Sequence, residues 1–187
     1  TVQETGDVPE AVPLYCLMGR WYGDALKRPD FALPCFAKAI EIDPHCDAAY
    51  EGSLTLYRGA QSWPEVVQVL EARAAASSNP AAARDHRAAA ADVVLRKVGD
   101  QARAVGMLEA ILEQDPGHPG AIDSLISIHE EKKEWKPLAK LLSRQLAHTA
   151  AGARVSGTLR LAELYEDRLN DFEQAIERPI ITVSGTV

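Results

Sequence analysis

The sequence predicts an all-α fold, an α-α superhelix in which about five helical hairpins form a right-handed solenoid. Alanine clusters in runs such as 81–83 and 88–91, whereas β-branched and aromatic runs are almost absent before the last ten residues. This bias favours helix over strand. Apolar residues between 12 and 177 recur with helical periodicity, and an internal repeat divides the chain into hairpin-sized units.

The internal repeat has a period of 72 residues. Three pairs of residues recur at this offset: Pro44 and Pro116, Trp63 and Trp135, and Leu70 and Leu142. One pair alone could be a coincidence, but three pairs at one offset indicate a true repeat. The unit of 72 residues divides into two hairpins of about 36 residues each.

Small residues extend this register to both helices of a hairpin. First helices carry Gly19, Ala91 and Ala162, and second helices begin with Ala32, Ala104 and Ala175. Small residues at fixed places on both helices allow the two backbones to approach closely. An aspartate precedes each of the second helices, where it can cap the free N–H groups of the first turn.

Breaks between these segments set the expected helix limits. Gly59, residues 77–80 and residues 116–120 are the strongest breaks, and Ser62 to Glu65 has the spacing of a capping box. We expect helices at about 12–24, 30–42, 47–59, 63–76, 81–98, 100–114, 119–132, 135–150, 153–168 and 171–177.

The first hairpin carries a recognisable pattern. It consists of the small residue Gly19, the aromatic Tyr22, then Ala32, Phe36, Ala39 and a terminal Pro44. This pattern resembles the tetratricopeptide repeat of bacterial-type tandem hairpins, with one residue inserted between the two helices. The resemblance extends over about residues 12–177 and is strongest in hairpins one, three and five.

Charge and composition restrict the partners. The net charge of -7 and the pI of 5.2 argue against a nucleic-acid or anionic-membrane surface, because both require a basic footprint. No apolar run is long enough to cross a bilayer, so we expect a soluble, cytoplasmic protein. Cys16, Cys35 and Cys46 are expected to be reduced and mostly buried, because their spacings match no known zinc motif, even with His45 added.

Sequence motifs for catalysis are missing. There is no nucleophile elbow, no Gly-rich phosphate loop and no HExxH, and the five histidines are scattered. We therefore expect no enzyme activity, no cofactor and no metal site. Trp63 and Trp135 could form an aromatic ligand clamp, but packing at the edge between neighbouring hairpins is the favoured interpretation.

The resemblance implies that the first helices line a concave groove and that their inward stripe contacts a partner. The implied positions are Arg20, Glu51, Thr55, Arg58, Asp92, Asp123, Ser127, Glu130 and Glu163. Because this groove is mostly acidic, we expect a protein or peptide partner that is basic or neutral. Capture of a terminal carboxylate is not expected, since none of these residues is Lys or Asn.

The predicted function is therefore that of a scaffold for protein or peptide binding. Two alternatives stay open: an assembly or regulatory fragment of a larger enzyme or secretion system, and a carrier that presents its C-terminal tail to a processing partner. We divide the chain into an N-terminal extension (1–11), the repeat domain (12–177) and an extended tail (178–187). Pro179 and the β-branched residues after it disfavour helix in this tail, which is a candidate for docking or self-association.

Overall fold

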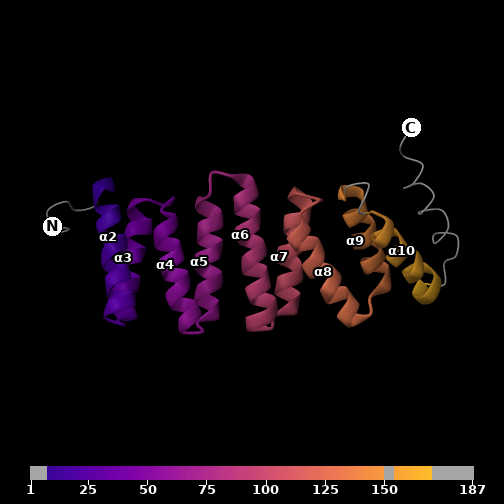
Figure 1. The fold of residues 1–187 in the computed structure, drawn as a ribbon, viewed down its shortest axis with the longest axis horizontal. Coiled ribbons are helices and arrows are strands. Elements are labelled where there is room, and N and C mark those ends of the chain that lie inside the picture. Colours follow the sequence, from indigo (N-terminus) through magenta and orange to yellow (C-terminus); the bar gives the residue numbers. More distant parts are fainter. Residues whose placement is uncertain (1–7, 150–153, 170–187) are drawn as a thin grey trace. The chain divides into compact units, whose positions relative to one another are not determined.

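The computed structural model describes residues 8–149 and 154–169, and all regular structure within these ranges is helical (Figure 1). A short 3₁₀ turn, Pro9–Ala11, leads into the first α-helix. The α-helices are α2 (Val12–Arg20), α3 (Pro29–Ile42), α4 (Asp47–Gly59), α5 (Trp63–Ala76), α6 (Pro80–Val93), α7 (Gln101–Gln114), α8 (Pro119–Lys132), α9 (Trp135–His148) and α10 (Arg154–Leu164).

These limits confirm the expected helices to within about two residues, once the turns that extend α2, α6 and α10 are included. The agreement follows from the local stops, because proline at 29, 80 and 119 occupies the first turn of a helix, where its missing N–H costs nothing. The expected helix 171–177 and the tail 178–187 lie outside the described residues. The division into extension, repeat domain and tail stays a prediction.

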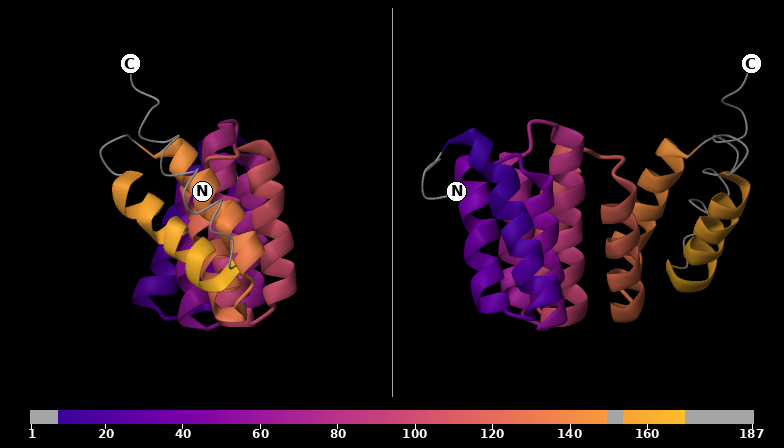
Figure 2. Two further views of the ribbon diagram at one scale, coloured as in Figure 1. Left: turned by 90° about the vertical axis from the view of Figure 1, so that its right-hand side faces the viewer. Right: turned by 60° about the vertical axis from the view of Figure 1, so that its left-hand side comes forward.

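The chain divides into two compact units, and the division along the chain falls within α7, between Ala104 and Val105. In the first unit each helix from α2 to α6 packs against the next one along the chain, and α2 also packs against α4. Figure 2 shows these helices running alternately up and down. In the second unit α8 packs against α9, and α9 against α10. Each unit is therefore built from consecutive antiparallel hairpins.

The first helices of hairpins one, three and five end in π-helical turns. These turns are Trp21–Ala25 after α2, Val94–Val98 after α6 and Tyr165–Leu169 after α10. A π-helical turn holds one more residue than an α-helical turn. It therefore accommodates the one residue by which the first hairpin is longer than the tetratricopeptide-repeat pattern. Because these turns occur in every second hairpin, the sequence repeats with a period of two hairpins.

The turn inside each of the first four hairpins contains a left-handed residue. Lys27, Gln61, Gly99 and Lys133 have φ values of 53°, 55°, 79° and 56°. A left-handed residue after a helix lets the chain reverse sharply, while the N–H groups that follow the helix donate hydrogen bonds to its last carbonyl groups. Only Gly99 adopts this conformation without a steric cost, so the other three positions carry strain.

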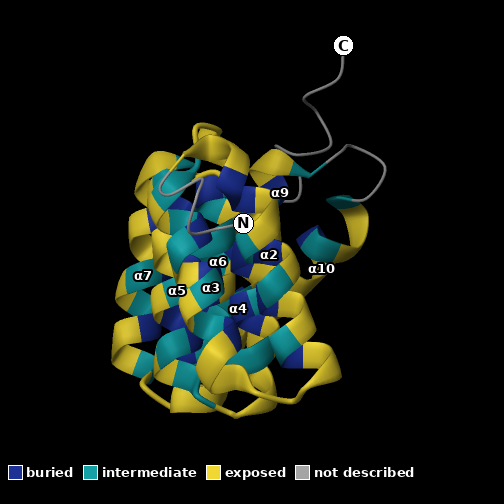
Figure 3. Ribbon diagram, turned by 90° about the vertical axis from the view of Figure 1, so that its left-hand side faces the viewer, coloured by how far each residue is buried: buried dark blue, intermediate teal, exposed yellow. Residues whose placement is uncertain are grey.

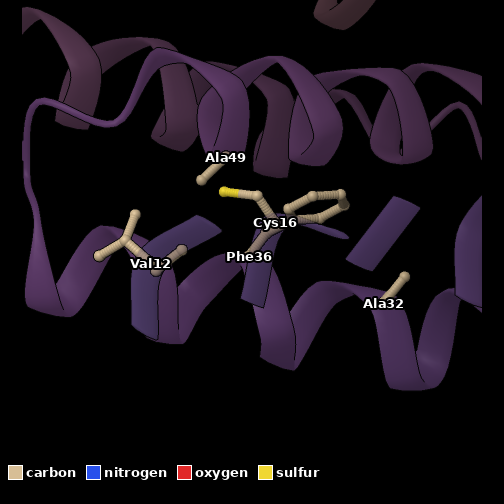
Figure 4. Close-up of a cluster of buried hydrophobic side chains, with 6 residues drawn as sticks. Val12, Cys16, Ala32, Phe36 and Ala49 are labelled. Carbon is tan, nitrogen blue, oxygen red and sulfur yellow. The ribbon is translucent and has the colours of Figure 1, made fainter. Parts of the chain in front are cut away.

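The core of the first unit is centred on Phe36, whose side chain is 1% exposed. Its ring lies among Val12, Cys16, Ala32 and Ala49 (Figure 4). Buried and exposed positions alternate around each helix (Figure 3), as expected for helices that bury one face against their neighbours.

Two expected helix caps differ from the structure. Ser62 is the residue before α5, but its side chain caps nothing, so the predicted capping box with Glu65 is wrong. Its ψ of 72° falls short of the extended conformation that aims a capping oxygen at the helix. Asp30 lies inside the first turn of α3, not before it, and its carboxylate pairs with Arg28.

Other caps are made by side chains that accept from the first free N–H groups. Asp100 accepts from the N–H of Arg103 at 3.0 Å, which confirms the expected aspartate cap of α7. Asn79 Oδ1 accepts from the N–H of Ala81 at 2.9 Å and caps α6. Asp171, the third expected cap, lies outside the described residues.

Candidate functional site

A hollow of about 270 Å³ lies between α2 and α4, the first helices of hairpins one and two. Its lining residues are Gly19, Arg20, Gly23, Asp24, Phe36, Ala48, Glu51, Gly52, Thr55 and Leu56. The set combines small and apolar side chains with polar ones at the rim. It provides space for a side chain of a bound segment and polar groups that can fix the orientation of that segment.

Small residues spaced four apart create this hollow. Gly19 in α2 and Gly23 in the π-helical turn after it lie four residues apart, and Ala48 and Gly52 share one face of α4. Their small or missing side chains leave room that the Phe36 ring fills only in part. A Cβ atom added at Gly52 would lie 2.3 Å from Phe36 Cζ, and one added at Gly19 would lie 2.6 Å from Phe36 Cε1. The ring is therefore wedged between two glycines from different hairpins.

The acidic rim of the hollow is partly neutralised by a cation from α5. Arg73 Nη1 lies 2.5 Å from Glu51 Oε1, and Arg73 Nη2 lies 3.0 Å from Asp47 Oδ1. The Arg73 side chain is only 15% exposed, whereas both carboxylates are well exposed. One half-buried guanidinium thus orients two carboxylates of α4 beside the hollow.

The structure brings three of the predicted groove residues together. Arg20, Glu51 and Thr55 line the same hollow, and the Thr55 hydroxyl donates to the carbonyl of Glu51 at 2.8 Å. Arg58 lies in the last turn of α4 and is exposed. Asp92 on α6 pairs with Arg96 at 2.5 Å, one helical turn away.

The remaining predicted residues lie in the second unit. Asp123 accepts from Gln145 Nε2 at 2.8 Å, and the Ser127 hydroxyl donates to the carbonyl of Asp123 at 3.1 Å. Glu130 forms an ion pair with Arg160. Glu130 and Glu163 line one hollow of about 230 Å³, together with Trp135 and Arg160.

Sequence reasoning missed the cations that meet these carboxylates. Arg73 reaches Glu51 across 22 residues, and Arg160 reaches Glu130 across 30 residues. The predicted inward-facing positions all lie on the first helices of the hairpins. Arg73 lies on a second helix, so the prediction did not include it. The predicted groove residues therefore carry less uncompensated negative charge than the sequence alone suggests.

The repeated tryptophans have equivalent surroundings. Trp63 and Trp135 are both half-buried. Lys97 Nζ lies 5.2 Å from the ring centroid of Trp63, and Arg168 Cζ lies 5.3 Å from that of Trp135. Each cation comes from the π-helical turn of the following hairpin. Packing between hairpins, reinforced by a cation over the ring, therefore accounts for both tryptophans without a ligand.

A smaller polar hollow of about 190 Å³ lies at the start of α4 and the end of α5. It is lined by Tyr50, Arg73 and His86, among others. Burial, helped by the positive charge of Arg73, lowers the pKa of His86 below its ordinary value of 6.5. His86 thus favours the neutral form in the folded chain.

The described part of the chain contains no group of three or more potential ligand side chains placed to hold a metal ion. None of its helices combines the length and the apolar character needed to cross a membrane.

Comparison with known proteins gives a match in structure only. No family model matches the sequence, and no curated protein matches it. Among solved structures, the chain is similar to the crystal structure of YrrB, a TPR (tetratricopeptide-repeat) protein with an unusual peptide-binding site. The TM-score is 0.53 at 16% identity, over 97% of this chain and 88% of that chain. The fold is that of the tetratricopeptide repeat.

A second solved structure, the assembly chaperone of RpL4 (Acl4, residues 1–338), aligns with 99% of this chain and 82% of that chain. Its identity is 17% and its TM-score is 0.40. The match to YrrB confirms the all-helical hairpin fold that the sequence predicts.

Proposed function

We propose that this chain is a scaffold that binds an extended or helical segment of a partner protein along the first helices of its hairpins. The observation that carries the proposal is the hollow between α2 and α4, where Gly19, Gly23 and Gly52 leave space beside a polar rim. The tetratricopeptide-repeat fold supports it, because stacked hairpins offer the surface of their first helices as a binding face.

The net charge of -7 favours a basic or neutral partner segment. Ion pairs such as Arg73 with Glu51 keep the rim from being uniformly negative. Specificity is then expected from the shape of the hollow more than from charge, and binding should depend only moderately on salt concentration.

The test replaces each of two exposed alanines by tryptophan, one at the hollow and one away from it. Ala48 is exposed at the hollow on α4, and Ala37 is exposed on α3 away from it. Peptides selected from a random displayed library against the purified chain should bind Ala37→Trp as tightly as the parent. They should bind Ala48→Trp at least about tenfold more weakly, because the indole fills the hollow. Equal binding to both variants would rule out the α2 and α4 face.

An assembly role, in which the stack positions other parts of a larger complex, draws on a different feature. Leu14 and Leu17 on α2 and Trp21 at the start of the following π-helical turn lie three and four residues apart and are 39%, 59% and 55% exposed. An exposed apolar stripe of this kind is typical of a surface that another element covers. If so, the fluorescence of Trp21 should shift to the blue in the larger complex, measured with Trp63 and Trp135 replaced by Phe. Unchanged emission would argue against this role.

A further inference from the structure

Two of the three cysteines meet across the boundary between hairpins one and two. Cys16 lies in the middle of α2, and Cys46 is the residue immediately before α4. Their Sγ atoms are 3.5 Å apart although the residues are separated by 30 positions. The Cys16 side chain belongs to the buried cluster around Phe36 (Figure 4). Cys46 packs against that cluster.

The two sulfurs are in direct non-bonded contact. A disulfide requires an S–S distance of about 2.05 Å, so the two sulfurs must approach each other by roughly 1.5 Å. Cys46 stands in the turn between α3 and α4, so a small adjustment of this turn can supply part of the approach.

The two thiols differ in how easily a reagent can reach them. Cys16 is 4% exposed, whereas Cys46 is only half-buried. Burial, together with the hydrogen bond and the charge of Cys46, raises the pKa of Cys16 to about 12. Cys46 is therefore the thiol that meets an oxidant first, and Cys16 is the one that reacts with it afterwards.

We propose that Cys16 and Cys46 form a reversible disulfide that links α2, the first helix of hairpin one, to the N-cap of α4, the first helix of hairpin two. The oxidant is a small-molecule disulfide of the glutathione class. The bond ties together the two helices that flank the hollow, so it couples the rigidity of this face to the redox state. The proposal does not depend on peptide binding.

The reaction is thiol–disulfide exchange in two steps. The Cys46 thiolate attacks one sulfur of oxidised glutathione, the S–S bond of glutathione breaks, and one glutathione thiolate leaves. Cys16 then transfers its proton to that thiolate and attacks Cys46 Sγ. The Cys16–Cys46 bond forms as the second glutathione leaves as a thiolate, which takes up a proton from water. Two protein thiols are oxidised, and one glutathione disulfide is reduced to two thiols.

The experiment compares the parent chain with Cys46→Ser and with Cys35→Ser, each treated with oxidised or reduced glutathione. Cys35 is half-buried on α3 and serves as the matched control, and serine is well tolerated at the cap position of Cys46. Mass spectrometry of proteolytic fragments identifies the link, and thermal unfolding measures its effect.

Oxidation of the parent should produce fragments joined through residues 16 and 46, and dithiothreitol should separate them. It should raise the melting temperature by roughly 5–10 °C, because the bond closes a loop of about 30 residues in the unfolded chain. Cys35→Ser should behave like the parent, and Cys46→Ser should show neither effect. A stable glutathione adduct on Cys46, a dimer linked between chains, or a linked pair without a rise in melting temperature would each overturn the proposal.

Discussion

The wedge of Phe36 between two glycines gives the sharpest stability prediction. Replacing glycine by alanine inside a helix usually stabilises by about 1 kcal/mol, because alanine has the higher helix propensity. At Gly52 the new methyl would lie 2.3 Å from Phe36 Cζ, far inside van der Waals contact. The ring has little room to move, because the same ring edge also packs against Gly19, where an added Cβ would lie 2.6 Å from Cε1 and 2.7 Å from Cζ. Overpacking of this kind costs about 1–3 kcal/mol or more.

We expect the cost of overpacking to exceed the gain in helix propensity, so that Gly52→Ala lowers the free energy of unfolding by about 2 kcal/mol. Gly106→Ala is the matched control, because Gly106 lies within α7 and an added Cβ there meets nothing within 4 Å. That variant should be more stable than the parent by up to about 1 kcal/mol. Urea denaturation followed by circular dichroism measures both changes.

A double-mutant cycle then attributes the effect to the ring. Phe36→Leu removes the ring atoms that an added methyl would strike, so Gly52→Ala should be neutral or stabilising in that background. The coupling energy between the two sites should be about 2–3 kcal/mol. If Gly52→Ala stabilises the parent as much as Gly106→Ala does, the close packing of α2, α3 and α4 around Phe36 is wrong.

Three further outcomes are expected. Lys133→Gly should raise the free energy of unfolding by about 1 kcal/mol in urea melts, because Lys133 is left-handed at φ 56°, whereas Lys132→Gly inside α8 should lower it. Ala104→Trp should cost more than ~2 kcal/mol, since Ala104 is fully buried, and an unchanged melting temperature would contradict this. Stability should fall as the pH drops below about 6.5, since the unfolded chain then binds a proton at His86 that the folded chain resists. His86→Gln should show a smaller fall over the same range, and an identical pH profile would exclude His86.

The sequence was sufficient to predict the helices because their ends are decided locally. Proline in the first turn, as at Pro80 and Pro119, and the turn residues before it act on neighbouring backbone groups, so they can be recognised without tertiary information. The π-helical turn after α2 is a different case. One inserted residue could be absorbed in a loop or in a helix, and the choice depends on packing that the sequence alone does not display.

The candidate site was predicted less completely because its contacts are long-range. Thr55 and Arg20 follow from the repeat register, and the structure places both at one hollow. The ion pair of Arg73 with Glu51 and the contact of Cys16 with Cys46 join residues 22 and 30 positions apart. Such pairs depend on how hairpins stack, so a one-dimensional pattern could not identify them.

The most direct test of the proposed binding face places a photo-crosslinking amino acid at Thr55, which is exposed at the hollow, or at Ala75, which is exposed on α5. Each variant is illuminated with a peptide selected against the parent chain. Binding at the first helices predicts crosslinking to the peptide from position 55, with little or none from position 75. Equal crosslinking from both positions, or crosslinking from position 75 alone, would contradict binding at the first helices.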